Sequence, residues 1–141
     1  MSEQQASPDR ILGLGLDLAE VSRFVASLRR HGRSFAERIC TGAEISEWER
    51  SGTPPGSLAA SFAAKEACLK ALGTGWAAGV TFRQVEILQS DGVGIHEVTL
   101  HGAALERATG MGVERIMLSL SLKSDIAAAL VILLGSRPAG L

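Results

Sequence analysis

The stretch from Ser61 to Gly75 constrains the fold most, because it predicts a helix without a polar face. Ala and Leu dominate it, and Gly73 is a typical helix stop. At about 100° per residue, an apolar stripe stands opposite a face of small residues. The stripe contains Leu58, Phe62, Leu69 and Leu72, and the small face contains Ala64, Ala67, Cys68 and Ala71. A helix that is apolar nearly all round is predicted to lie buried among the other elements.

Three charged residues of this helix do not fit a simple amphipathic pattern. Lys65 falls inside the apolar stripe, and Glu66 and Lys70 flank it. Because a buried, unpaired charge is strongly unfavourable, these side chains need partners: each other, a metal ion or a charged ligand. The simpler interpretation is a surface pair between Glu66 and Lys70, which have the favourable i,i+4 spacing. The absence of a polar face favours a functional site instead.

Residues 11–18 alternate between two faces and predict a strand. One face carries Leu12, Leu14, Leu16 and Leu18, and the other carries Gly13, Gly15 and Asp17. We expect the leucine face in the core. The two glycines leave a bare lane, leading to the carboxylate of Asp17, along which another chain or a ligand can approach. A dinucleotide-binding fingerprint is excluded, because a third glycine and a following parallel unit are missing.

The next segment predicts a basic helix. Apolar residues recur at helical spacing at Val21, Phe24, Val25 and Leu28. Between residues 18 and 38, five arginines stand against two glutamates, in a chain whose net charge is −1. The arginines are Arg23, Arg29, Arg30, Arg33 and Arg38. Such a local excess indicates docking of an acidic partner, and a solvated basic surface is the alternative.

The remaining segments predict an α+β fold with an antiparallel sheet. A capping box at Thr41 and Glu44 predicts a helix over residues 42–50. Further strands are expected at residues 80–82, 85–87, 95–100, 116–122 and 126–134, and a helix at 103–110. Turn residues at 91–94 join a hairpin, and residues 123–125 join a closing antiparallel pair.

Length and composition indicate one domain of an ordinary globular protein. Of the 141 residues, we assign 1–10 to a flexible N-terminus, 11–135 to the domain and 136–141 to a tail. With net charge near zero and no Tyr, the chain lacks the features of a nucleic-acid-binding surface. Neither a signal peptide nor a membrane span is evident. Cys40 and Cys68 have no metal-type spacing and fit reduced thiols, so we expect a cytoplasmic protein.

Asp17 and Glu66 would form an oxygen-ligand metal site if the fold brings them together. Two carboxylates without clustered His or Cys favour Mg²⁺ over zinc, with the remaining ligands supplied by water and phosphate oxygens. A pyrophosphate substrate suits such a site. Lys70, and with it Lys65, would offset the charge that develops during phosphoryl transfer to a hydroxyl.

Two motifs closely resemble those of the holo-acyl-carrier-protein synthases, the single-domain class of 4′-phosphopantetheinyl transferases. The first is Phe62-Ala-Ala-Lys65-Glu66-Ala-x-x-Lys70-Ala-x-Gly73-Thr-Gly75, and the second is Gly13-Leu-Gly15-Leu-Asp17 followed by Arg23. Further similarity lies at residues 35–39 and 80–82. The resemblance implies the 4′-phosphopantetheinyl transferase fold and a homotrimer with three interface sites.

The resemblance also implies a reaction. Coenzyme A would donate 4′-phosphopantetheine to a serine of an apo acyl carrier protein, releasing adenosine 3′,5′-bisphosphate. Asp17 and Glu66 match the family's metal ligands, and together with Lys70 they are the expected catalytic residues. Coenzyme contacts are expected from Lys65, Lys70, Arg23, Gly73 and Ser121, and the acidic carrier protein would dock on the region of Arg23, Arg29 and Arg30. The general base is left open between a water held by Glu66 and a water on the metal.

Three positions depart from the family pattern, all on the coenzyme side. Leu122 follows Ser119-Leu-Ser121 where the family usually has a His that reaches the coenzyme phosphates. His96 lies where a Gly-Lys-Pro turn is usual, and Ser61 replaces a common Arg. We therefore keep two alternatives to the enzyme: a non-catalytic relative that binds coenzyme A or a carrier protein, and a structural oligomer in which Lys65, Glu66 and Lys70 form only a salt-bridge network.

Overall fold

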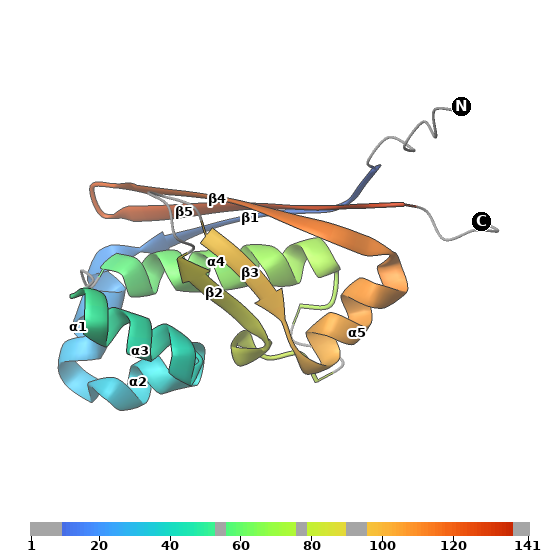
Figure 1. Ribbon diagram of the computed structural model, residues 1–141. Coiled ribbons are helices and arrows are strands. Elements are labelled where there is room, and N and C mark those ends of the chain that lie inside the picture. Colours follow the sequence, from blue (N-terminus) through green and yellow to red (C-terminus); the bar gives the residue numbers. More distant parts are fainter. Residues whose placement is uncertain (1–9, 53–55, 76–78, 90–95, 137–141) are drawn as a thin grey trace, which may run out of the picture.

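The computed structural model describes residues 10–52, 56–75, 79–89 and 96–136 and has two layers (Figure 1). Strands β1, β5 and β4 form a three-stranded antiparallel sheet in that order, and β2 and β3 form a two-stranded antiparallel sheet. The elements are β1 (Arg10–Glu20), α1 (Val21–His31), α2 (Arg33–Ile39), α3 (Gly42–Ser51), α4 (Gly56–Leu72), η1 (Phe82–Gln84), β2 (Val85–Gln89), β3 (His96–Leu100), α5 (Gly102–Met111), β4 (Val113–Lys123) and β5 (Ile126–Gly135). The predicted α+β class with antiparallel strands is confirmed.

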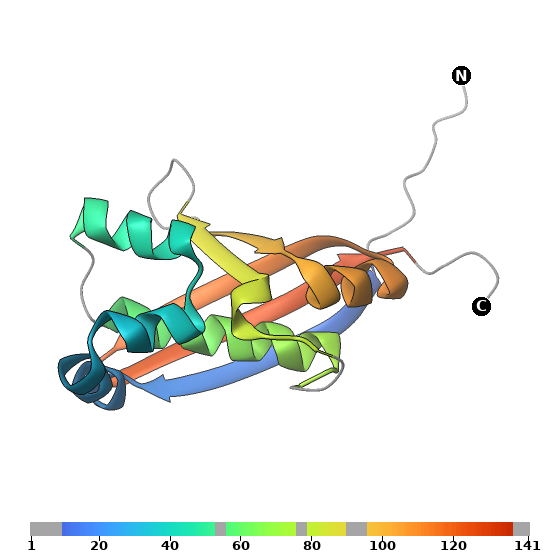
Figure 2. The same ribbon diagram turned by 90° about the horizontal axis from the view of Figure 1, so that it is seen from below.

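Helix α4 lies along one face of the larger sheet and organises the core, as its apolar composition predicts. Figure 2, seen from below, shows α4 running along the sheet, with α1, α2 and α3 at one end and α5 at the other. Most of its side chains are buried, including Leu58, Leu69 and Leu72. The helix ends at Leu72, and Gly73 follows with φ 72°. The backbone conformation of Gly73 is one that favours glycine at a helix end.

The prediction that the leucine face of β1 belongs to the core is wrong for three of its four leucines. Leu14, Leu16 and Leu18 are 61%, 59% and 62% exposed, whereas Leu12 packs against the core. The glycine face lies on α4 instead. A Cβ atom on Gly13 or Gly15 would overlap carbonyl oxygens of α4. An alternating pattern shows that the two faces of a strand differ but not which one is covered. Here α4 covers the face of Gly13 and Gly15, because only glycine lets the two backbones approach so closely.

The outer face of the three-stranded sheet is therefore mostly apolar, and much of it is exposed within one chain. The strand register aligns residues of β1, β5 and β4 in rows across this face. The rows are Leu14–Ile132–Met117, Leu16–Leu130–Ser119 and Leu18–Ala128–Ser121. A continuous apolar face of this kind usually marks a contact with another protein surface.

Most remaining elements lie where the sequence predicts them. The capping box is present, because Thr41 Oγ1 accepts from the backbone N–H of Glu44 and the Glu44 carboxylate accepts from the N–H of Thr41. The hairpin of β2 and β3 and the antiparallel pair of β4 and β5 are confirmed. The predicted strand at 80–82 is wrong, because this segment leads into the short helix η1. The side chain of Gln84 in η1 donates to the Gly79 carbonyl oxygen and accepts from the Ala104 N–H.

Several predictions fall outside the described residues: the N-terminal segment up to residue 9, the turn at 91–94 and the tail from residue 137 onward. Within the described parts of the chain, no helix has the length and apolar character needed to cross a membrane.

Candidate functional site

The end of β1 and the second half of α4 bring Asp17, Glu66 and Lys70 together. Lys70 Nζ donates to Asp17 Oδ1 at 2.8 Å and to the Leu16 carbonyl oxygen at 3.0 Å. The antiparallel ladder holds Asp17 opposite Ala129 of β5, so its position is set by the sheet. The ion-pair partner of Lys70 is thus Asp17, and the simpler interpretation of a Glu66–Lys70 surface pair is wrong.

Glu66 is the second carboxylate of this cluster, and its pKa is sensitive to the charge of Asp17. Burial raises the pKa of Glu66, the negative charge of Asp17 raises it further, and the positive charge of Lys70 partly opposes the shift. The two carboxylates are therefore close enough for the charge of Asp17 to disfavour ionisation of Glu66. Raised pKa values of this origin are more frequent at functional sites than elsewhere, because a ligand can compensate the repulsion.

The residues present fit a hard divalent cation with few protein ligands. Asp17 and Glu66 supply carboxylate oxygens, and the described residues contain no group of three or more His, Cys, Asp or Glu side chains that could enclose a metal. With Lys70 included, the three side chains have a net charge of −1 when ionised. Such a set suits Mg²⁺, which keeps several waters and binds substrate phosphates.

Lys65 does not lie in this cluster. Its side chain is 0% exposed, and its ammonium group donates to Glu44 Oε1 at 2.8 Å and to the carbonyl oxygens of Phe82 and Val85 at 3.1 and 2.6 Å. An ammonium group has three N–H donors, and all three are used here. The geometry therefore contradicts the expectation that Lys65 contacts the coenzyme. The proposed salt-bridge network is absent as well, since no ion pair joins Lys65, Glu66 and Lys70 to one another.

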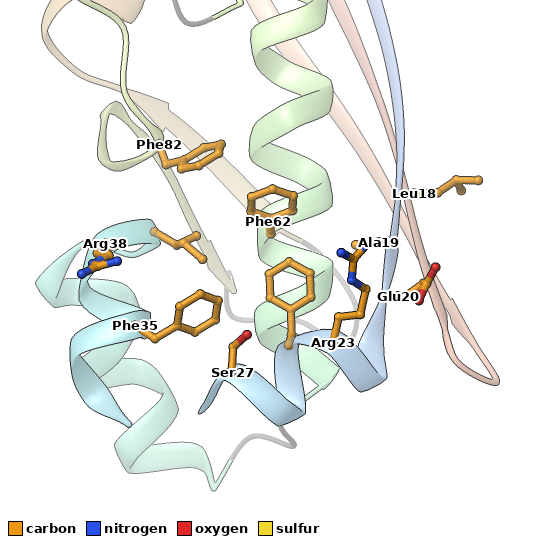
Figure 3. A pocket seen from close by; sticks show the side chains of 11 residues that line it. Leu18, Ala19, Glu20, Arg23, Ser27, Phe35, Arg38, Phe62 and Phe82 are labelled. Atoms are coloured by element: carbon orange, nitrogen blue, oxygen red, sulfur yellow. The ribbon is translucent and has the colours of Figure 1, made fainter. Parts of the chain in front are cut away.

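An apolar pocket of about 600 Å³, shown in Figure 3, is lined in part by the end of β1 and by Phe62 of α4. Four phenylalanines line it in a chain of ring contacts, with centroids 6.1, 5.0 and 5.0 Å apart. In order along this chain they are Phe35, Phe24, Phe62 and Phe82. Two arginines, Arg23 of α1 and Arg38 of α2, also line the pocket, together with Ser27, Ile39 and the end of β1. Phe62 precedes Glu66 by one helical turn, so this aromatic pocket is adjacent to the candidate metal site.

A second pocket, of about 290 Å³, contains all three departures from the family pattern. Ser61, His96 and Leu122 line it together with Ser121. The other lining residues are Glu44, Glu47, Trp48, Ser57, Ala60, Ile87, Gln89 and Leu120. Two of the lining residues are glutamates and none is Lys or Arg. Since phosphate recognition in proteins depends mostly on cationic and N–H donors, this acidic pocket is poorly suited to a phosphate group.

One chain does not unite every residue expected at the coenzyme. Arg23 lies in the aromatic pocket, Ser121 lies in the acidic pocket, and Gly73 lies one turn beyond Lys70 at the end of α4. The two pockets share no lining residue. Of the site residues predicted from the sequence, Asp17, Glu66 and Lys70 are the ones that form a cluster of interacting side chains.

Comparison with known proteins identifies the lineage of this arrangement. Residues 13–130 match the family model described as the 4′-phosphopantetheinyl transferase superfamily. The chain belongs to this superfamily. Among curated members of the 4′-phosphopantetheinyl transferases, it is 48% identical over 123 residues to the holo-[acyl-carrier-protein] synthase of Maridesulfovibrio salexigens, covering 87% of this chain and 98% of that protein. The protein of the same name from Vibrio cholerae is 46% identical, with coverage of 87% and 97%.

Solved structures of transferases with this name share the fold. The crystal structure of the Neisseria meningitidis holo-[acyl-carrier-protein] synthase has a TM-score of 0.79 and 35% identity, covering 88% of this chain and 98% of that one. The Helicobacter pylori enzyme, in complex with coenzyme A, has a TM-score of 0.72 and 27% identity, with coverage of 85% and 98%. The resemblance found in the two motifs thus extends over most of this transferase.

Sequence reasoning missed one residue that supports the site of this 4′-phosphopantetheinyl transferase. Glu44 was identified only as part of a capping box, yet its carboxylate also accepts from Lys65, from the Ser61 hydroxyl and from the backbone N–H of Ile87. Glu44 lies in the first turn of α3, where a capping role explains a Glu, and its ion-pair partner Lys65 is 21 residues away. No pattern along the chain indicates such a pair.

The two cysteines of this transferase are excluded as nucleophiles. Both are buried as free thiols, and burial raises the pKa of Cys40 and that of Cys68 to about 12. A thiol with so high a pKa carries almost no reactive thiolate near neutral pH.

Proposed function

We propose that this protein transfers 4′-phosphopantetheine from coenzyme A to a serine hydroxyl of an apo acyl carrier protein, and that the reaction depends on Mg²⁺. The observation that carries the proposal is the meeting of Asp17, Glu66 and Lys70 at one place. It gains weight from curated relatives named holo-[acyl-carrier-protein] synthase, one of which is 48% identical to this chain. Free, buried cysteines are compatible with a cytoplasmic location.

In the proposed reaction the serine oxygen forms a bond to the β-phosphorus, the one that carries the pantetheine arm. The bridging bond to the α-phosphate breaks, adenosine 3′,5′-bisphosphate leaves, and the hydroxyl proton passes to a base. Asp17 and Glu66 would hold Mg²⁺, which supplies positive charge to the pyrophosphate when bound. Lys70, whose side chain is 52% exposed and whose ammonium group is already beside Asp17, is placed to contact a phosphate oxygen. Lys65 has no part in these contacts.

The acidic carrier protein would dock on α1 and the mouth of the aromatic pocket. Arg23, Arg29 and Arg30 are exposed on α1, and Arg38 of α2 is exposed at the same pocket. Positive charge around an apolar recess is complementary to an acidic surface that presents an apolar side chain. The adjacency of this pocket to Glu66 would bring an acceptor serine toward the pyrophosphate.

We also propose a homotrimer. The apolar outer face formed by β1, β5 and β4 would be covered by neighbouring copies, since Leu14, Leu16 and Leu18 are too exposed for an isolated chain. Ser121 lies in the acidic pocket and Arg23 in the aromatic pocket, and this separation within one chain supports sites that are completed across subunit contacts. Three equivalent contacts would then give three sites.

A second candidate function is a relative that binds without efficient transfer. It is favoured by the acidic pocket, where Ser61 and Leu122 replace the basic residues that the family resemblance leads one to expect. Loss of one hydrogen bond to a charged group typically costs about 1.5–3 kcal/mol, or one to two decades in affinity. A loss of this size weakens the grip on coenzyme A and leaves the metal ligands intact, so we place transfer first.

The decisive experiment measures transfer directly. The protein is incubated with coenzyme A, Mg²⁺ and apo acyl carrier proteins of fatty-acid and polyketide type, and each acceptor is weighed by mass spectrometry. We expect the mass of a phosphopantetheine group on at least one acceptor, and none with Asp17→Ala or with excess EDTA. Binding of the donor by calorimetry without any modified acceptor would favour the second candidate.

A further inference from the structure

Helix α1 lacks a cap of its own and receives one from a distant turn. Its N-cap residue, Glu20, makes no side-chain capping bond, and its first turn has no acidic residue. Instead, Asp125 caps the helix from 103 residues away. The Ser22 backbone N–H donates to Asp125 Oδ1 at 2.8 Å, and the Ser22 hydroxyl donates to Oδ2 at 2.7 Å. The Val21 N–H donates to the Asp125 carbonyl oxygen at 2.8 Å.

Asp125 lies in the tight turn that joins β4 to β5. Lys123 pairs with Ile126, so Ser124 and Asp125 form a two-residue loop. Ser124 has φ 53°, the only positive value found at a non-glycine residue in the described chain. This conformation is unfavourable for a serine and persists only where surrounding contacts maintain it. The bonds from Asp125 to α1 are contacts of that kind.

Packing beside the turn adds to the same junction. A Cβ atom on Gly56 would lie 3.4 Å from a methyl group of Leu122 and 3.5 Å from one of Val21. The end of β4 and the start of α1 therefore both reach the first residue of α4. Helix α1 has no fully buried side chain, and Val21 and Phe24 near its start are partly buried against the core. The bonds from Asp125 add to this packing in holding the N-terminus of the helix.

Asp17 is held independently of this cap. Four consecutive pairs join the end of β1 to β5, from Asp17 with Ala129 to Glu20 with Ile126. Lys70 adds a side-chain bond to Asp17. Loss of the Asp125 carboxylate would thus loosen α1 and its Arg23 without moving the carboxylates proposed to bind the metal.

We propose that Asp125 is a positioning residue that sets α1 for the acceptor protein. Its effect falls on the docking of the carrier protein, through Arg23 and the rim of the aromatic pocket, and not on the binding of coenzyme A or the metal. The inference rests on the proposed function, because it assigns α1 to the carrier protein.

The test compares Asp125→Ala, Asp125→Asn and the control Glu114→Ala in the full-length protein. Glu114 accepts from the Ser136 hydroxyl at 2.6 Å at the opposite end of β4, so its loss removes a comparable long-range bond far from α1. For Asp125→Ala we expect the KM for the carrier protein to rise about three- to tenfold, in line with the loss of a helix cap. The KM for coenzyme A should stay within twofold. Asn retains an acceptor for the Ser22 N–H and should restore most of the affinity, and Glu114→Ala should change neither constant.

Amide hydrogen exchange separates positioning from general loss of stability and does not depend on activity. In Asp125→Ala the Ser22 amide should exchange about five- to tenfold faster, whereas amides of β5 should keep their protection. An unchanged carrier-protein KM, a proportional rise of both KM values, or unchanged exchange at Ser22 would each overturn the proposal. A wild-type protein that modifies no carrier refutes the proposed function and with it the acceptor role of α1, while the Ser22 exchange rate still decides whether Asp125 holds the helix.

Discussion

The ammonium group of Lys65 lies 2.8 Å from the carboxylate of Glu44, and both side chains are buried. This ion pair joins the middle of α4 to the first turn of α3. The remaining donors of Lys65 bind the carbonyl oxygens of Phe82 and Val85, and Glu44 also accepts from Ile87 of β2. A buried pair with every donor and acceptor satisfied fixes the rotation of α4 about its axis, and the adjacent Glu66 is thereby directed to the side of Asp17.

Replacing Lys65 by Met should destabilise the protein severely. The change leaves the Glu44 carboxylate buried without its counter-ion, which typically costs about 3–5 kcal/mol. Urea unfolding at neutral pH measures the loss. Lys70→Met is the matched control, because its pair with Asp17 is half exposed and exposed pairs contribute about 0–1 kcal/mol. Equal stability of the two variants would contradict the structural role assigned to Lys65.

The raised pKa of Glu66 predicts a specific pH dependence of stability without metal. Since the ionised form is disfavoured in the folded state, Glu66 opposes folding above its folded-state pKa, and this penalty is lost as the pH falls through that pKa. Glu66→Gln should therefore be more stable than the wild type near pH 7 in EDTA, and the difference should shrink toward pH 4. Urea midpoints across this range test the sign. If the stability advantage of Glu66→Gln over the wild type grew as the pH fell, the folded protein would be stabilising the ionised form of Glu66, contrary to this prediction.

Leu122→His should strengthen binding of coenzyme A. Leu122 is half exposed at the acidic pocket, so an imidazole can be accommodated there. One added bond to a phosphate group is expected to lower the Kd about tenfold or more, and more at pH 6 than at pH 8 because the imidazole is then protonated. Calorimetry with Leu122→Gln as an uncharged control measures the change. If Leu122→His bound coenzyme A no more tightly than the wild type at either pH, the phosphates of the coenzyme would not lie at this pocket.

Leu16→Glu should prevent the proposed self-association. Leu16 lies in the central row of the apolar outer face, and a carboxylate there would be buried by any covering subunit. We expect the wild type to have three times the chain mass of 14.8 kDa in light scattering, and the variant to have the mass of one chain. Ala43→Glu, on the exposed side of α3, is the control. A monomeric wild type would remove the basis for sites shared between subunits.

Much of the architecture follows from local patterns. The burial of α4, the capping box at Thr41 and the β4–β5 pair are all consequences of residues near one another in the chain, and all are found. The acidic pair was also a prediction from the sequence, because Asp17 ends a strand and Glu66 lies on a helix without a polar face. Patterns of this kind are a good guide to whether a segment forms a helix or a strand.

Other features depend on contacts that no local pattern contains. Which face of β1 meets α4 was decided by close backbone approach at Gly15, and the direction of Lys65 was decided by Glu44. The cap that Asp125 supplies to Ser22 is of the same kind, since it joins residues that are far apart in the sequence. Side-chain partners across such separations are set by the assembled fold, so sequence alone predicted a buried Lys65 but assigned it to the wrong neighbour.

The missing side chains at Gly13 and Gly15 have a chemical consequence. At these positions the backbone of β1 comes against the carbonyl groups of Ala67 and Ala71, with no room for even one methyl group. Asp17 is on the strand and Glu66 is on the helix, so the distance between these two carboxylates depends on how closely strand and helix pack. The substitution Gly15→Ala would force the strand and the helix apart. We expect the proposed metal site of this variant to prefer a cation larger than Mg²⁺.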